Sequence, residues 1–528
     1  MIDEYQRCLI RAMHNTSIYP HDTDQFHLIE THISWVLLCG SYAYKIKKAI
    51  DLGFLDFTTL DKRKFYCEEE LRLNGRLAPE LYLAVVPITG TPDQPQLGGT
   101  GEAFEYAVQM RRFPQDALLS YMRQHNLLAT THIDQIIAQV ADFHHVIPAV
   151  TARTDRGDPE RVSAPVHENF VQIREYTREF RHLRLLDRLR AWAEHEYDSC
   201  HAHFRQRKER GFIRECHGDM HLGNMAVVDG RVVIFDGIEF NPDLYWIDVM
   251  NEAAFLCMDL EYHGKRNFAC RFLNGYLERT GDYQGLRVFH YYLAYRAMVR
   301  AKVACIRSSQ RAGLDPQSPE FERYLRLALG YTHPQQPVLF ITHGLSGSGK
   351  STLSGSLIEP LAAIRIRSDR ERQRMFGKGR REGEAATVCE GVYSESATRQ
   401  TYEKLAELAE AVLESGYSAI IDATFLGHQQ REPFKQLADR LGVPIRILFF
   451  RADADVLRQR VRDRQREGSD ISEADLSVLE RQLARYAELH DEERVYTITI
   501  DTQSVSEADK ILARVNQSLQ QVFQNRVV

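Results

Sequence analysis

The sequence predicts an α+β domain with a small β-rich lobe and a larger helical lobe, followed by an α/β domain with a parallel doubly wound sheet. Three observations support this prediction. Strand-like segments crowd the first 112 residues, helical periodicity dominates residues 113–332, and strands alternate with helices after residue 333. The length of 528 residues also exceeds what one domain ordinarily spans. We therefore expect domains over residues 1–332 and 333–528.

In the first domain, two apolar segments flank Gly40-Ser41-Tyr42 and predict a β-hairpin. A helical pattern at 61–77 follows, and a Gly/Pro-rich stretch at 89–101 predicts a loop. The strands expected in this domain are 34–39, 43–47, 81–87 and 104–110, with a further hairpin of 225–228 and 232–235 inside the helical lobe.

Four prolines within residues 311–337 indicate the domain boundary, which we place near residue 333. An apolar run begins directly after Pro337 and predicts the first strand of the second domain. The strands expected there are 338–342, 364–367, 418–422, 445–450 and 495–500.

Composition narrows the function classes. Lys and Arg number 67 against 73 Asp and Glu, and the net charge of −6 disfavours a wholly basic nucleic-acid binder. Nine cysteines, an odd number without a C-x-x-C pair, are typical of a reducing compartment. No apolar run approaches the about 18 residues of a membrane span, and no signal peptide is recognisable. We expect a cytoplasmic protein without a membrane partner, and its oligomeric state stays open.

The first chemical motif is His217-Gly218-Asp219-x4-Asn224, followed by an apolar strand that ends at Asp236. Phosphoryl transfer needs a carboxylate to orient the acceptor hydroxyl, an amide oxygen for a metal ion, and a second carboxylate between metal and phosphates. Asp219, Asn224 and Asp236 offer these groups in that order.

These residues resemble the catalytic loop and metal-binding segment of the aminoglycoside phosphotransferase family, whose members are related to protein kinases. The resemblance implies a protein-kinase-like bilobal fold, Asp219 as catalytic base, and Asn224 and Asp236 as magnesium ligands. It also implies that His217 braces the loop and that residues 106–112 form the hinge that meets adenine.

A kinase-like domain further needs a strand lysine for the phosphates of ATP and a helix glutamate that holds it. Lys45 and Lys47 lie on the same face of one predicted strand, and we prefer Lys45. In the following helix, Glu68, Glu69 and Glu70 are the candidates for the glutamate; Glu70 aligns best with the apolar face, although such a run is also typical of a solvated surface.

Acidic residues follow this motif between apolar ones. They indicate either an acidic cleft for a polycationic substrate or, as we prefer, an amphipathic helix with acidic surface positions. The residues concerned are Asp243, Asp248, Glu252, Asp259 and Glu261.

The second motif, G-x4-G-K-S, lies between a predicted strand and a predicted helix, which is the context that a P-loop requires. Backbone N–H groups of such a loop bind the β-phosphate, Lys350 reaches the β- and γ-phosphates, and the Ser351 hydroxyl ligates magnesium. The nucleotide-binding residues expected here are Gly344, Ser346, Gly347, Ser348, Gly349, Lys350, Ser351 and Thr352.

Further positions suit a P-loop kinase. Asp422 ends a buried strand and is placed to hold the metal ion. Residues 458–464 are rich in arginine and resemble the lid of small-molecule P-loop kinases, in which Arg460 would clamp the transferring group; a solvated helix face is the other interpretation. By the same resemblance, Asp369 orients the acceptor hydroxyl and Arg372 binds the substrate.

The second domain thus resembles the AAA-type kinases related to gluconate kinase, zeta-toxin and polynucleotide kinase. The tandem order resembles the bifunctional aminoglycoside phosphotransferase/ATP-binding family. This implies an ATP- and Mg²⁺-dependent phosphotransferase with two nucleotide sites that acts on hydroxyl groups of small molecules. Alternatively, the P-loop domain is a regulatory ATPase switch or a nucleic-acid 5′-kinase, although no aromatic residue interleaves the arginine run to stack on bases.

Overall fold

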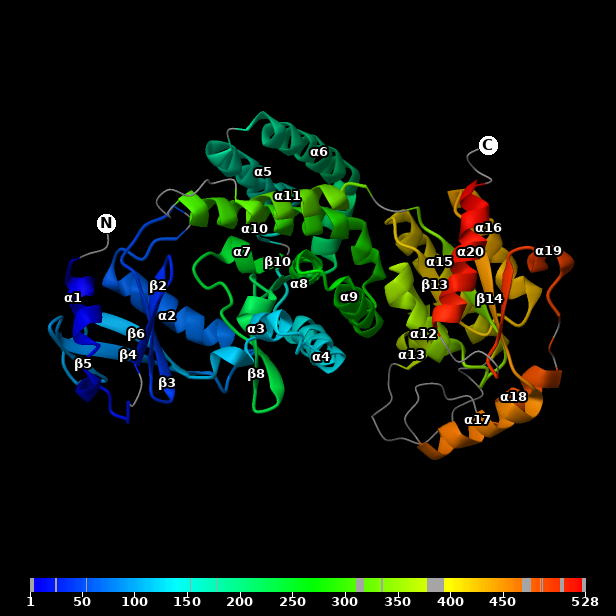
Figure 1. Ribbon diagram of the computed structural model, residues 1–528, viewed down its shortest axis with the longest axis horizontal. Coiled ribbons are helices and arrows are strands. Elements are labelled where there is room, and N and C mark those ends of the chain that lie inside the picture. Colours follow the sequence, from blue (N-terminus) through cyan, green and yellow to red (C-terminus); the bar gives the residue numbers. More distant parts are fainter. Residues whose placement is uncertain are drawn as a thin grey trace. The chain divides into compact units, whose positions relative to one another are not determined.

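The computed structural model describes residues 4–23, 26–53, 55–151, 153–177, 179–309, 318–333, 336–377, 394–467, 476–484, 486, 488–503 and 508–524. The chain forms two compact units, and each unit is made of two separate stretches of the sequence (Figure 1). Unit 1 comprises residues 1–260 and 295–322, and unit 2 comprises residues 261–294 and 323–528. Among the described helices, none combines the length and apolar character needed to cross a bilayer.

Unit 1 contains a six-stranded antiparallel sheet with the order β1-β2-β3-β6-β4-β5. The apolar residues of helix α1 (Glu4–Ala12) pack with those of the sheet, around Leu9, Trp35 and Ile46. Helix α2 (Leu60–Asn74) begins at Thr59, whose side chain accepts a hydrogen bond from the backbone N–H of Lys62. The strands are β1 (Phe26–Glu30), β2 (Ser34–Cys39), β3 (Tyr42–Lys47), β4 (Tyr82–Thr91), β5 (Gln94–Leu97) and β6 (Glu105–Arg111).

Helices and two short two-stranded sheets make up the remainder of unit 1. Strands β8 (Met225–Val228) and β9 (Arg231–Ile234) form the predicted hairpin, and β7 (Ile213–Glu215) pairs with β10 (Trp246–Asp248). The helices that begin in this unit are α3 (Leu119–Gln124), α4 (Thr130–Val146), α5 (Pro159–Tyr176), α6 (Phe180–Glu209), α7 (Pro242–Tyr245), α8 (Val249–Tyr262) and α11 (Pro319–Tyr331); α10 (Phe289–Ser309) lies mostly in it.

Three features of this unit differ from the sequence analysis. Strand β1 was not predicted, and β5 occupies part of the expected loop at 89–101. The expected hinge at 106–112 is mostly strand β6, whose backbone pairs with β3 on one side and with β4 on the other. The backbone N–H of Arg112 donates to Ser41 O at 2.9 Å as well. Most backbone groups of this segment are therefore already paired within the sheet.

Unit 2 is built on a five-stranded sheet in which every pair is parallel, which confirms the predicted parallel sheet. Its order is β12-β13-β11-β14-β15, so the strand that leads into the P-loop is central. Helices α12 (Lys350–Leu361) and α20 (Ala508–Gln524) share an apolar core with this sheet. The strands are β11 (Leu339–His343), β12 (Ile364–Arg367), β13 (Ala419–Asp422), β14 (Ile445–Arg451) and β15 (Thr497–Asp501), each within two residues of its predicted range at both ends.

The other helices of unit 2 carry or flank the P-loop site. Helix α15 packs against β12 and β13, and α16 packs against α15. These helices are α9 (Arg266–Thr280), α13 (Ser368–Phe376), α15 (Glu395–Glu414), α16 (His428–Leu441), α17 (Ala454–Glu467), α18 (Leu476–Ala484) and α19 (Asp491–Arg494). Residues 311–317 and 334–335 of the proline-rich stretch taken as the domain boundary, and Cys389, lie outside the described residues.

Candidate functional site

In unit 1, two lysines of β3 and one glutamate of α2 form a buried charge cluster. Lys45 Nζ lies 2.7 Å from Glu70 Oε1, and Lys47 Nζ lies 2.7 Å from Glu70 Oε2. Of the three candidate glutamates, Glu70 is fully buried, whereas Glu68 is exposed and Glu69 pairs with Arg72. Glu70 therefore bridges the two lysines that share one face of the strand.

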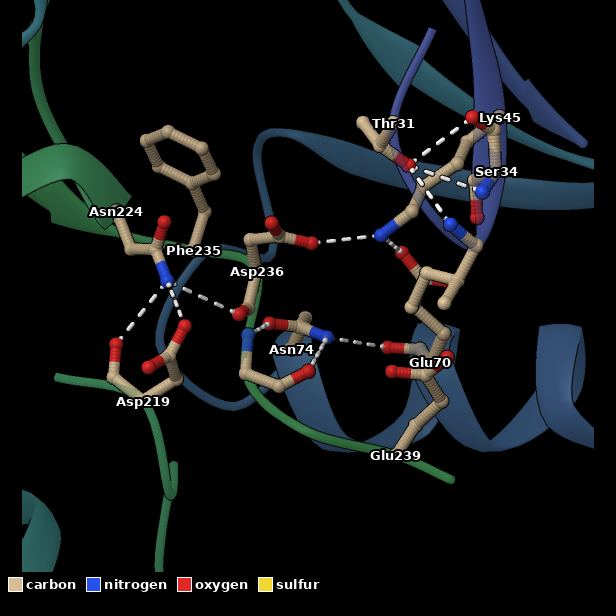
Figure 2. Close-up of polar contacts among 12 residues, drawn as sticks. Thr31, Ser34, Lys45, Glu70, Asn74, Asp219, Asn224, Phe235, Asp236 and Glu239 are labelled. Atoms are coloured by element: carbon tan, nitrogen blue, oxygen red, sulfur yellow. Dashed lines mark hydrogen bonds and ion pairs between the residues drawn. The ribbon is translucent and has the colours of Figure 1, made fainter. Parts of the chain in front are cut away.

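Each lysine has a second acidic partner, and these partners distinguish Lys45 from Lys47. Lys45 Nζ donates to Asp236 Oδ1 at 2.6 Å (Figure 2). Lys47 instead pairs with Glu239, and both of these side chains are buried. The Asp236 side chain is 48% exposed, so the Lys45 side of the cluster opens toward solvent. Lys45 therefore lies at the accessible end of the network.

Opposite charges offset the cost of burying this cluster. Burial disfavours the charged Lys45 ammonium, but Asp236 and Glu70 raise its pKa well above the ordinary value. Burial likewise opposes ionisation of Glu70, yet the two lysines lower its pKa to about 2. Lys45 and Glu70 are therefore both charged at neutral pH.

The loop from His217 to Asn224 presents Asp219 beside Asn224. Asn224 Nδ2 donates to Asp219 Oδ2 and to the Asp219 carbonyl, both at 3.0 Å, and to Asp236 O at 3.3 Å (Figure 2). Gly218 has φ +87°, and a Cβ there would lie 2.7 Å from the carbonyl oxygen of Leu244, so glycine is required. The side-chain amide of Asn224 thus links the loop to the segment after β9 by hydrogen bonds.

Histidines hold this loop in place. The His217 ring donates through Nε2 to Phe235 O at 2.9 Å and accepts at Nδ1 from Asp219 N at 3.3 Å. Burial raises the pKa of Asp219, but His221, whose Nε2 lies 3.4 Å from Asp219 Oδ2, together with Arg300 and His217 lowers it, and the net pKa falls below its ordinary value. The Asp219 carboxylate is therefore ionised.

The acidic residues of α8 and β10 correct both sequence interpretations, because three of them are buried. Glu252 Oε1 accepts from the backbone N–H groups of His217 (2.7 Å) and Gly218 (2.6 Å), and His144 Nε2 donates to Glu252 Oε2 at 2.8 Å. Asp259 accepts from Leu222 N at 3.0 Å, and Asp248 pairs with Arg207. These carboxylates are internal supports, neither a cleft nor a surface.

Two further supports were missed from the sequence. Asp236 has φ +61°, a sparsely populated conformation for a residue with a side chain. Its N–H donates to Tyr82 Oη at 3.1 Å, and the next N–H, of Gly237, donates to Asn74 Oδ1 at 2.6 Å. Tyr82 and Asn74 are more than 150 positions away in the sequence, so no local pattern could have identified them.

In unit 2, the loop between β11 and α12 has the conformation that its glycines allow. Gly347 has φ +80°, and a Cβ there would lie 2.9 Å from Leu457 O. Lys350 is the first residue of α12, and its Nζ donates to Leu345 O at 2.8 Å. Burial lowers the pKa of Lys350 to about 8.

A cavity of about 390 Å³ adjoins this loop. It is lined by most of the predicted residues, namely Ser346, Gly347, Gly349, Lys350, Ser351, Thr352, Asp369, Asp422 and Arg460. Gly344 and Ser348 belong to the loop but are not among the described lining residues. The cavity has the size of a small-ligand site.

Two carboxylates face the cavity. Asp422 is buried, and its Oδ2 accepts no hydrogen bond from any residue that the structure describes. Burial, and then the nearby Asp422, raise the pKa of Asp369. Asp422 and Ser351 both line the cavity, and carboxylate and hydroxyl oxygens are donors of the kind that Mg²⁺ prefers.

The arginine run on α17 divides between the cavity and the surface. Arg460 Nη1 and Nη2 donate to Thr502 Oγ1 and Thr502 O, both at 2.9 Å, and Arg464 also lines the cavity. Arg458 instead pairs with Glu480 and Asp455, away from the cavity lining. The solvated-face interpretation therefore holds for Arg458, whereas Arg460 and Arg464 lie on the cavity wall.

Comparisons with known proteins agree with these two constellations. Residues 64–289 match the phosphotransferase enzyme family, and residues 339–489 match the family described as AAA domain. Uncharacterized proteins of Mycobacterium bovis and Mycobacterium tuberculosis are 30% identical over 479 residues, which cover 91% of this chain and 94% of theirs. A crystal structure of a gluconokinase from Sinorhizobium meliloti is 19% identical and covers 37% of this chain and 97% of its own, with a TM-score of 0.27.

The support from Glu252 can be tested by substitution. Glu252→Ala leaves two buried N–H donors without an acceptor, and each such loss costs about 1–3 kcal/mol. Glu252→Gln retains an oxygen for both donors. We expect Ala to lower the thermal unfolding midpoint of unit 1 far more than Gln does, as measured by calorimetry. Equal unfolding midpoints for the two variants would contradict the claim that Glu252 stabilises the loop through these hydrogen bonds.

The charge cluster predicts a pH dependence. Because the pKa of Glu70 is lowered from 4.5 to about 2, its ionisation stabilises the fold above pH 4.5, and this stability is lost as pH falls toward 2. Relative to Glu70→Gln, the wild-type free energy of unfolding should therefore fall by about 3 kcal/mol over that window. Denaturant titrations at several pH values measure it. The exposed Glu68→Gln is the control, and a difference independent of pH would refute the prediction.

Proposed function

The chain belongs to the family in which a phosphotransferase domain precedes a P-loop AAA domain, and we propose that it has two ATP–Mg²⁺ sites that each phosphorylate a hydroxyl group of a small molecule. The observation that carries the proposal is the convergence of Lys45, Glu70 and Asp236 with the Asp219–Asn224 pair. These residues come from four separate segments of the chain.

At the first site, Lys45 binds the α- and β-phosphates of ATP, held in place by Glu70. The carboxylate of Asp236 and the amide oxygen of Asn224 are the residues that would hold Mg²⁺, and oxygen donors of this kind fit that ion. When bound, Mg²⁺ neutralises the charge that develops on the phosphates.

Asp219 orients the acceptor hydroxyl and receives its proton. The acceptor oxygen then attacks the γ-phosphorus, the bond to the ADP oxygen breaks, and the phosphoryl group moves to the acceptor. The lowered pKa of Asp219 supports this role, because the carboxylate is unprotonated and ready to accept a hydrogen bond. Fixed geometry then supplies much of the rate acceleration.

At the second site, backbone N–H groups of the P-loop and Lys350 bind the β- and γ-phosphates. Ser351 and Asp422 would hold Mg²⁺, and the open Asp422 oxygen supports this assignment. Asp369 orients the second acceptor hydroxyl. Arg460 and Arg464 lie on the cavity wall, where guanidinium groups can bind the transferring phosphoryl group.

Paired variants test the two sites. Asp219→Asn and Lys350→Ala should each abolish one phosphorylation reaction, with a loss of about 10²–10⁴-fold. A metabolite extract incubated with γ-labelled ATP reports the labelled products of each variant. The exposed Asp229→Asn and the half-buried Lys404→Ala are the matched controls.

The pattern of loss identifies the mode of action. If Lys350→Ala only retunes a product that Asp219→Asn removes, the P-loop site is a regulatory switch. If neither substitution changes labelling in an extract that the wild-type protein labels, the proposal is refuted.

A further inference from the structure

The edge of the parallel sheet is completed by a helix that precedes it in the chain. Strand β12 is an edge strand, and Asn274 of α9 contacts its free side. Asn274 Oδ1 accepts from Arg365 N at 2.8 Å, and its Nδ2 donates to Ala363 O at 3.0 Å. One side-chain amide thus satisfies two backbone groups that an adjacent strand would otherwise pair.

Helix α9 falls within the segment that matches the phosphotransferase family, yet it packs as part of unit 2. One turn after Asn274, Glu278 meets the arginines that follow β12. Its carboxylate lies 3.3 Å from Arg367, 3.2 Å from Arg370 and 3.5 Å from Arg365, and its carbonyl accepts from Arg374 at 2.7 Å.

These arginines keep Glu278 charged. Burial opposes its ionisation, but Arg367 and Arg365 lower its pKa below the ordinary value. The Glu278 side chain is 18% exposed, so its attraction for the guanidinium groups is only partly screened by water.

Arg367 lies between Glu278 and the P-loop cavity. It lines the cavity, and a second carboxylate is within ion-pair range, because its Nε lies 3.8 Å from Asp422 Oδ2. That oxygen is the one that accepts no hydrogen bond from the described residues. A short turn of the guanidinium would close this gap, and the resulting fork would occupy an oxygen that a metal ion needs.

We propose that Glu278 is a positioning residue of the P-loop site: it holds Arg367 off Asp422 and thereby keeps that carboxylate open to Mg²⁺. The inference rests on the proposed function, since it assumes that Mg²⁺ with nucleotide binds this cavity. A residue of the phosphotransferase-matched segment thus sets the metal affinity of the P-loop site.

Calorimetric titration of the full chain with ADP, with and without Mg²⁺, tests this. The reference protein carries Asp236→Asn, so that the metal-dependent signal comes from the P-loop site. Adding Lys350→Ala to this reference should abolish that signal, which shows that it belongs to the P-loop site. In this reference, Mg²⁺ should tighten ADP binding. Adding Glu278→Gln should reduce that enhancement about tenfold and leave metal-free ADP binding unchanged.

Two further variants separate positioning from general damage. Glu414→Gln removes the ion pair between Glu414 and Arg287, a residue of the phosphotransferase-matched segment, and Glu414 is not among the described residues that line the P-loop cavity. This variant should keep the full Mg²⁺ enhancement of ADP binding. The double variant Glu278→Gln, Arg367→Ala should recover the Mg²⁺ enhancement of ADP binding, because the guanidinium that competes for Asp422 is gone. Arg367→Ala alone should bind Mg·ADP at least as well as the reference.

Several results would overturn the inference. Equal weakening of ADP binding with and without Mg²⁺ in Glu278→Gln would indicate a purely structural role, as would failure of the double variant to recover. If Glu278→Gln does not fold, a loss of the enhancement in Arg367→Ala alone would refute the inference. A reference protein without any Lys350-dependent, Mg²⁺-enhanced ADP binding would instead refute the proposed function.

Discussion

The structure of the first site depends on one constraint, the burial of two lysine ammonium groups on a single strand face. Neither Lys45 nor Lys47 could remain charged there alone, because desolvation of an unpaired charge costs several kcal/mol. Glu70 between them and Asp236 and Glu239 beyond them compensate that cost, and these carboxylates come from α2 and from the segment after β9. The cluster therefore fixes β3, α2 and the segment after β9 relative to one another (Figure 2). Lys47 and Glu239 form its buried end, and Lys45 and Asp236 form its accessible end.

The second recurring feature is that each loop bearing a candidate catalytic group is held by buried polar side chains. Glu252 and Asp259 of α8 accept backbone N–H groups of the loop that carries Asp219. Tyr82 and Asn74 hold the unusual conformation at Asp236. In unit 2, Asn274 and Glu278 perform the corresponding task beside β12. Buried networks of this kind hold a site rigidly only when every group is paired, and so catalytic geometry depends on residues that touch no reactant.

Local sequence patterns predicted the parts of both sites that are local in the chain. The H-G-D-x4-N and G-x4-G-K-S motifs each bring their residues together within one loop, and the central strands β11 and β13 of the parallel sheet are largely apolar runs. Position along a strand could not decide between Lys45 and Lys47, because alternate residues share a face. Glu252 looked like a surface residue because its partners, two backbone N–H groups of a distant loop, leave no pattern. The helical period of α9 likewise indicates an apolar face but cannot show which elements that face packs against. Strand β5 was missed because the glycine and proline residues around it are typical of a loop.

Two nucleotide pockets in one chain, each with its own cation and carboxylates, are the central claim. The stoichiometry of bound nucleotide tests it most directly. Equilibrium dialysis of the full chain against saturating labelled ADP with Mg²⁺ should give two equivalents bound for the wild type, one each for Lys45→Ala and Lys350→Ala, and none for the double variant. A single equivalent in the wild type, or loss of all binding through either substitution alone, would contradict the account.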